Sequence, residues 1–96
     1  MYATIRWRER GTASPDELAR AGRALAAHLG GLAGFVACLF LEAPDGGYAA
    51  IGIFEDRANL VAADELVAGW SPIELPAPWA EPSHRFTGEV VMQRGL

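Results

Sequence analysis

Residues 35–54 read FVACLFLEAPDGGYAAIGIF, which is two apolar runs of strand length, 35–41 and 48–54, joined by a short turn. Proline, aspartate and two glycines at 44–47 supply the turn, so the runs are predicted to pair as an antiparallel hairpin. Successive side chains of a strand point to opposite faces of a sheet, yet both runs are apolar at nearly every position. We therefore expect both faces of this hairpin to be shielded from water.

Two elements are predicted before the hairpin. Residues 2–10, YATIRWRER, alternate between apolar and polar side chains, which is typical of a strand with one apolar and one polar face. Ser14 can cap the helix that follows, with Pro15 at its first position and Glu17 at the capping-box position. Leucine and alanine then recur at helical spacing until the glycine pair at 30–31 ends this helix.

Three further segments follow the hairpin. Asp56 can cap a second helix that runs to about residue 69. Residues 71–82 contain four prolines and are predicted to be an irregular arm, because proline neither continues a helix nor pairs in a central strand. Residues 84–94 alternate again and are predicted to form the last strand.

The elements follow the order β-α-β-β-α-β, and right-handed crossovers turn this order into a four-stranded antiparallel sheet with two helices on one face. This is the ferredoxin-like α+β plan, and residues 1–96 are expected to form a single domain of it. Two helices cover one face of the sheet, so we expect a second copy of the chain to cover the other, as a homodimer. Aspartate at Phe40 is then expected to give monomeric or unfolded protein, whichever face that side chain occupies.

Composition excludes several classes of partner. The chain has 96 residues and a net charge of −4, and all eight of its basic residues are arginine. An acidic chain is a poor candidate for nucleic acid, which proteins contact through a basic stripe. RNA-recognition modules share the strand order, but Ala50 stands where the second stacking ring after Tyr48 is needed. No apolar run reaches about 18 residues, so we expect no membrane partner and a cytoplasmic location.

Metal and thiol chemistry have little support in the sequence. The single cysteine, Cys38, lies in the middle of a predicted strand and is interpreted as a small buried apolar side chain. His28 and His84 are isolated, so no spacing typical of metal ligands is present and no metal is expected. The acidic pairs at 16–17 and 64–65 are interpreted as carboxylates on helix surfaces.

Several short segments carry a resemblance to a known family. They are MYATIR at 1–6, LAGF at 32–35, IFEDRA at 53–58, and Trp70 at the end of the second predicted helix. In these segments the chain resembles the dimeric α+β barrel superfamily, and within it the antibiotic-biosynthesis monooxygenase-like domains. The resemblance implies a homodimeric barrel in which two sheets face each other and the helices lie outside. It also implies a ligand cleft between the sheet and the helices of each subunit.

Members of this superfamily that degrade haem use an asparagine, a tryptophan and a histidine. The matching positions fall near Thr4, Ala63 and Ile73 of this chain, so all three residues are missing. His28 and His84 lie elsewhere and do not replace the histidine. Haem degradation is therefore disfavoured, and no cofactor is expected.

Other members oxidise polycyclic phenols without a cofactor, and the resemblance implies the same class of activity here. Such chemistry needs an apolar cleft, a hydrogen-bond partner for the phenolate and exclusion of water. We interpret Trp70 and His84 as cleft residues, His84 as a general base, and Arg6 as a partner for an anion. Trp70 can instead be plain core, and His84 a solvated side chain. Arg6 and its neighbours Arg8 and Arg10 can instead form the solvated face of an edge strand.

The predicted function is thus a cofactor-independent monooxygenase that acts on a small aromatic or apolar compound. Two alternatives stay open: a non-catalytic module that binds a small hydrophobic ligand or only dimerises, and an isomerase or lyase of the same superfamily. The nature of the space between the sheet and the helices distinguishes the enzyme hypothesis from the module hypothesis. A cleft with polar groups favours an enzyme, an apolar cavity favours a binding module, and a fully packed space leaves dimerisation alone.

Overall fold

The computed structural model describes residues 1–10, 14–69 and 84–96 of the chain. Its elements are β1 (Tyr2–Arg8), α1 (Pro15–Leu29), β2 (Phe35–Glu42), β3 (Tyr48–Phe54), α2 (Arg57–Gly69) and β4 (His84–Glu89). The predicted β-α-β-β-α-β order is confirmed. The predicted arm at 71–82 lies outside the described residues.

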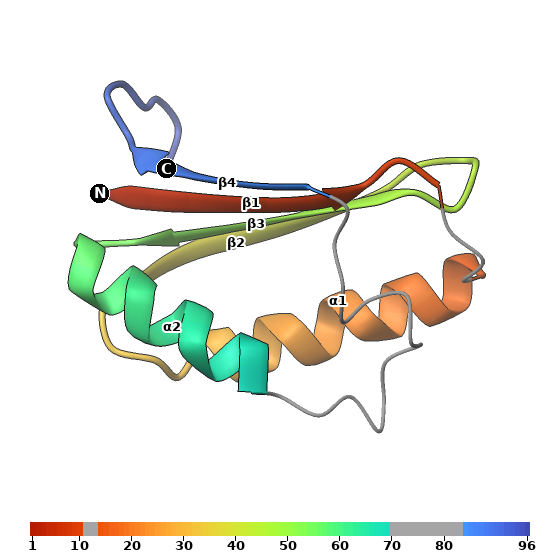
Figure 1. Ribbon diagram of the computed structural model, residues 1–96, viewed down its shortest axis with the longest axis horizontal. Coiled ribbons are helices and arrows are strands. Elements are labelled where there is room, and N and C mark those ends of the chain that lie inside the picture. Colours follow the sequence, from red (N-terminus) through yellow and green to blue (C-terminus); the bar gives the residue numbers. More distant parts are fainter. Residues whose placement is uncertain (11–13, 70–83) are drawn as a thin grey trace.

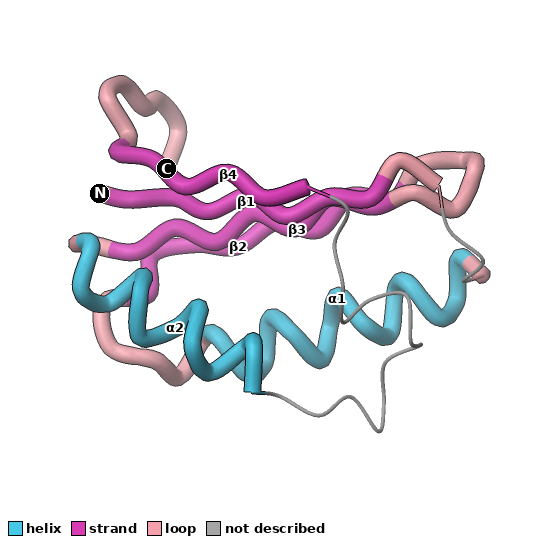
Figure 2. The backbone as a smooth tube through the Cα atoms, in the orientation of Figure 1, coloured by secondary structure: helices cyan, strands magenta, loops and turns pink. Residues whose placement is uncertain are grey.

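Within the described residues, the four strands form one antiparallel sheet in the order β2-β3-β1-β4. Figure 1 shows both helices on the same side of this sheet, and Figure 2 shows the strands as a separate layer above them. This is the ferredoxin-like α+β fold that the sequence predicts. No helix in the described part of the chain is long and apolar enough to span a membrane.

Two strands are shorter in the structure than the sequence pattern predicts. β1 ends at Arg8 because its partner β3 begins at the residue opposite, Tyr48. β4 ends at Glu89, and beyond it Val90 N donates one more backbone hydrogen bond to Met1 O at 2.8 Å. The alternating pattern in the sequence therefore extends beyond the residues that have a neighbouring strand with which to pair.

Both helices begin where the sequence predicts a cap. At the start of α1, Ser14 Oγ accepts a hydrogen bond from Glu17 N at 3.2 Å. At the start of α2, Asp56 Oδ1 accepts one from Asn59 N at 2.8 Å. These bonds satisfy amide donors that the first turn of a helix otherwise leaves unpaired, which helps to fix where each helix starts.

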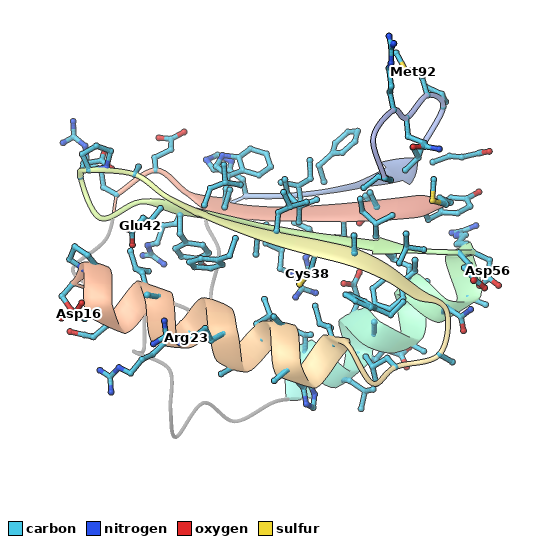
Figure 3. All side chains as sticks on the ribbon, turned by 180° about the vertical axis from the view of Figure 1, so that it is seen from behind. Asp16, Arg23, Cys38, Glu42, Asp56 and Met92 are labelled. Carbon is cyan, nitrogen blue, oxygen red and sulfur yellow. The ribbon has the colours of Figure 1, made fainter. Side chains whose placement is uncertain are left out.

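The core lies between the helices and one face of the sheet. α1 contributes a stripe of buried side chains: Leu18, Ala21, Leu25 and Leu29. Phe54 of β3 and Leu60 of α2 are the largest fully buried side chains. α1 approaches β2 closely at Gly22, where an added Cβ would lie 2.9 Å from the ring of Phe40. Figure 3 shows Cys38 on the same inner side of β2, between the sheet and the helices.

The connection from α1 to β2 requires a glycine. Gly34 has a φ of 74°, in the left-handed region, and a Cβ there would collide with the side chain of Asn59. Gly34 O also accepts a hydrogen bond from Glu55 N at 2.8 Å. This glycine therefore holds the entry to β2 against the end of β3 and the start of α2.

The opposite face of the sheet, called the outer face below, is apolar and carries no helix among the described residues. Its exposed apolar side chains include Leu39 and Leu41 of β2 and Phe86 of β4, which are 50% to 63% exposed. The apolar row of β1 lies on this face too, because the alternate residues Thr4 and Arg6 face the helices. The segment 90–96 projects from β4 on the side away from the helices (Figure 1), and Val91 and Met92 in it are exposed. The described part of one chain therefore leaves apolar sheet surface exposed, as the sequence predicts.

Candidate functional site

A small cavity lies between the sheet and the helices. Its apolar walls come from both layers, with Leu25 and Leu29 of α1, Ala50 and Phe54 of β3, and Ala63 and Val67 of α2. Three polar side chains also line it, Thr4 and Arg6 from β1 and Asp64 from α2. Its volume is about 20 Å³, which is room for about one water molecule. The space is therefore neither fully packed nor purely apolar.

Arg6 and Asp64 form an ion pair across the two layers. Arg6 Nη2 lies 2.7 Å from Asp64 Oδ1, and the two side chains are 11% and 21% exposed. Burial lowers the pKa of Arg6 below its usual value, the Asp64 carboxylate opposes this, and the charge of Arg85 lowers the pKa further. Arginine remains charged in proteins, so the pair places a shielded positive charge in the cavity wall. Within the described residues, Arg6 Nε has no hydrogen-bond partner.

Thr4 links the cavity to the edge strand β4. Its hydroxyl oxygen lies 3.2 Å from the hydroxyl oxygen of Thr87 and 3.5 Å from the carbonyl oxygen of Phe86. Thr4 is directly opposite Thr87 in the strand register, and Arg6 is directly opposite Arg85. β1 and β4 thus present a threonine pair and an arginine pair on the helix-facing side of the sheet.

His84 lies on the outer face. Its ring stacks on Trp7 with centroids 4.9 Å apart and 16° between the planes, and its Nε2 is 3.4 Å from Glu9 Oε1. The register places Trp7 opposite His84 and Arg6 opposite Arg85, so His84 and Arg6 point to opposite faces of the sheet. This geometry corrects the expectation that both residues line one cleft. Of the two, only Arg6 lines the cavity.

The arginine row of β1 differs from the solvated edge that the sequence pattern favours. β1 lies between β3 and β4, so it is not an edge strand. Arg6 faces the helices and is mostly buried, Arg8 is half-buried, and Arg10 is exposed. A guanidinium can be buried at this point because a carboxylate on α2 offsets much of the cost of removing it from water.

Asp64 is a site residue that the sequence pattern places on a helix surface and the structure places in the cavity wall. It lies four residues after Leu60 and next to Ala63, both of which are buried. Helical spacing therefore puts it at the margin of the apolar stripe of α2, which is the signal that could have identified it. Thr4 could have been identified from the period of two that it shares with Arg6. Trp70, the remaining predicted site residue, lies outside the described residues.

Cys38 and Tyr48 are further titratable side chains on the inner side of the sheet. Burial raises the pKa of the Cys38 thiol, which disfavours the reactive thiolate. Tyr48 is buried and stacks on Phe40 with centroids 5.8 Å apart, and burial raises its pKa too. No group of three side chains that could hold a metal ion occurs among the described residues.

No protein-family model matches the chain, and no curated protein sequence matches it. Among solved structures, the chain is similar to the crystal structure of a mutant of SnoaB, described as a cofactor-independent oxygenase from Streptomyces nogalater. The TM-score is 0.63 at 23% sequence identity, and the match covers 99% of this chain and 96% of that one. The chain therefore shares its fold with this oxygenase, which confirms the ferredoxin-like α+β fold that the resemblance implies.

Proposed function

We propose that the chain is a cofactor-independent monooxygenase that acts on a small aromatic or apolar compound between its sheet and its helices. The observation that carries this proposal is the Arg6–Asp64 ion pair in the wall of an otherwise apolar cavity. A charged pair in such a place favours an enzyme over a purely apolar binding pocket. The fold shared with SnoaB, described as a cofactor-independent oxygenase, supports the same class of reaction.

The proposed reaction needs no external reductant. A phenol with an activated CH₂ group reacts with O₂, one oxygen atom becomes a new carbonyl, and the other leaves as water with the two CH₂ hydrogens. The CH₂ carbon supplies all four electrons that O₂ accepts, so atoms and electrons balance. The protein has to orient the substrate, stabilise negative charge when the substrate loses a proton, and exclude water.

Arg6 is in a position to stabilise that negative charge. Its guanidinium is shielded from water, and electrostatic interactions are stronger in such a place than in solvent. We propose Trp70 as an aromatic wall of the same cleft, a role that rests on the sequence alone. His84 stacks on Trp7 at the outer face, so the general-base role predicted for it from the sequence does not belong to this cleft.

The size of the cavity favours a second candidate function. Pockets for drug-sized ligands occupy roughly 300–1,000 Å³, whereas this cavity occupies about 20 Å³. A substrate therefore has to displace side chains or move α2 relative to the sheet. If neither movement occurs, the chain is a non-catalytic module that dimerises or binds a very small ligand. An isomerase or lyase would use the same ion pair without consuming O₂.

Oxygen uptake tests the proposal. The purified protein is supplied with a panel of anthrone-like polycyclic phenols in an oxygen electrode, and the products are identified by mass spectrometry. We expect uptake with at least one phenol, and a rate about 100-fold lower in the double variant Arg6→Gln/Asp64→Asn, which keeps a neutral hydrogen-bonding pair. Glu65→Gln changes the exposed neighbour of Asp64 and is expected to keep the wild-type rate.

Circular dichroism of each variant separates a lost reaction from a lost fold. If no phenol causes uptake and a tightly retained, unreactive compound is found in the purified protein, the binding module is supported instead. Conversion of a substrate without oxygen uptake would favour the isomerase or lyase.

We further propose that a second copy of the chain covers the outer face. The apolar side chains of β2 and β4 on this face, together with Val91 and Met92, form more exposed apolar surface than isolated side chains would. A face-to-face pairing of two sheets would bury them. Sedimentation at micromolar concentration is expected to show a dimer, and a stable monomer there would contradict the proposal. The homodimer is expected in the cytoplasm, a location that rests on the sequence alone.

A further inference from the structure

Two arginines face each other across neighbouring strands. Arg6 of β1 and Arg85 of β4 are directly opposite in the register, on the helix-facing side of the sheet. The Cβ atoms of such pairs lie about 4.5–5.5 Å apart, and like charges at this separation destabilise a sheet. Burial lowers the pKa of Arg6 most, and the nearby charge of Arg85 lowers it further, in keeping with this repulsion.

Among the described residues, one carboxylate forms a salt bridge with this pair of arginines. Asp64 is bound to Arg6 through Nη2, at 2.7 Å. Within the described residues, no salt bridge joins Arg85 to a carboxylate, and Arg6 Nε is buried without an acceptor. A buried donor that lacks an acceptor is unfavourable, and more so when its group is charged. The arrangement therefore carries one positive charge and one hydrogen-bond donor in excess.

The neighbouring cavity offers space for the missing acceptor. Arg6 and Thr4 line it, and its volume of about 20 Å³ accommodates about one oxygen-sized group. Apolar side chains such as Leu25 and Val67 form the rest of its wall. The space thus suits a polar oxygen at the end of an apolar molecule.

We propose that Arg6 and Arg85 form an anion subsite, in which an ionised oxygen of the ligand accepts hydrogen bonds from Arg6 Nε and from the Arg85 guanidinium. The ligand is an aromatic compound that carries a carboxylate or an ionised phenol. Arginine binds such oxygens through its planar array of donors, and an anion between the two guanidinium groups also removes their mutual repulsion. The inference rests on the proposed function only in taking the bound compound to be the substrate.

Binding of matched probes tests the subsite without any turnover. 2-Naphthoate and its neutral analogue 2-naphthamide are titrated into the full chain by isothermal calorimetry at neutral pH. We expect the carboxylate to bind about tenfold more tightly than the amide, because hydrogen bonds to charged groups are stronger. 2-Naphthol, titrated below and above the pKa of its hydroxyl, shows whether an ionised phenol is accepted as well as a carboxylate.

Arg85→Gln is expected to weaken the binding of naphthoate about tenfold and to leave the affinity for naphthamide unchanged. Arg20→Gln removes the same charge from the exposed side of α1 and is expected to change neither affinity. Arg85 is exposed, so its substitution is not expected to unfold the chain. The Nε–H resonance of Arg6 should shift when naphthoate is added, and it should shift less with naphthamide.

Equal affinities for naphthoate and naphthamide would overturn the subsite, as would an equal loss of both in Arg85→Gln or no binding of either probe. The outcome is separable from that of the oxygenase proposal. Anion binding that depends on Arg85, without oxygen uptake from any phenol, would keep the subsite and reject the oxygenase. Oxygen uptake without a preference for the anion would keep the oxygenase and reject the subsite.

Discussion

At the scale of single residues, the ionisation of Tyr48 is expected to make the stability of the fold depend on pH in the alkaline range. Its side chain is 6% exposed, and burial raises its pKa above the ordinary 10.0, although the charges of Arg8 and Arg6 oppose the rise. The folded chain therefore holds the phenolic proton more tightly than the unfolded chain does. This contribution to stability is fully present below pH 10.0 and is lost as the pH rises through the folded-state pKa.

We expect the free energy of unfolding to fall above about pH 10, and to fall less steeply in Tyr48→Phe than in the wild type. Urea denaturation across a series of pH values measures both slopes. Burial also raises the pKa of Cys38 from an ordinary 9.0, so its contribution begins to be lost at a lower pH. Cys38→Ala isolates that part of the decline. Identical slopes above pH 10 in wild type and Tyr48→Phe would contradict the burial of this phenol.

The charged residues of the candidate site show which site residues can be predicted from the sequence and which cannot. Arg6 was identifiable because arginine suits anions and the residue lies on a predicted strand. Its partner Asp64 is 58 positions away on another element, and no local pattern joins the two. The face occupied by His84 depends on the pairing of β4 with β1, and a slip of one residue in that register would move the side chain to the other face.

At the scale of elements, α1 depends on its cap. Ser14 Oγ accepts from Glu17 N and also donates to Glu17 Oε1, both at 3.2 Å. We expect Ser14→Ala to lower the free energy of unfolding by about 0.5–2 kcal/mol, because an amide of the first turn loses its acceptor. Ser14→Asp keeps an acceptor in place and is expected to remain close to wild type, which urea denaturation of both variants measures. Equal destabilisation by both substitutions would mean that the cap is not what holds this end of α1.

The strand β1 shows where pattern-based prediction of an element stops. Alternation over residues 2–10 correctly predicted a strand and separated its two rows of side chains. It did not reveal which row faces the helices, because that choice depends on what the other elements provide. The polar row, with Thr4 and Arg6, faces inward because β4 supplies a hydroxyl and α2 supplies a carboxylate. The apolar row is consequently left on the outer face.

At the scale of the whole molecule, the two faces of the sheet have different covers. The helices close the inner face, where Phe54 of β3 and Leu60 of α2 are fully buried. The outer face exposes apolar side chains of β2 and β4 in a single chain. A second cover was expected from the sequence of residues 35–54, because both faces of the hairpin are apolar and the two helices together cover only one of them (Figure 1). The assignment of individual residues to each face needed the structure.

Adjacent residues of β2 make a matched test of that assignment. Leu39 is 51% exposed on the outer face, whereas Phe40 packs inward against Tyr48 and Gly22. We expect Leu39→Asp to abolish the proposed dimer and retain the fold, because the carboxylate stays in water when no second copy covers it. Phe40→Asp is expected to unfold the chain, because it removes a large packed ring and buries a carboxylate without a partner.

Sedimentation velocity and far-ultraviolet circular dichroism, measured on both variants at the same concentrations, distinguish the two outcomes. The wild type should also melt at a temperature that rises with protein concentration, since association stabilises the folded state by mass action. That dependence should disappear in Leu39→Asp if its fold survives. A Leu39→Asp protein that sediments as the same dimer as wild type would show that the apolar row of β2 is not what the second copy covers.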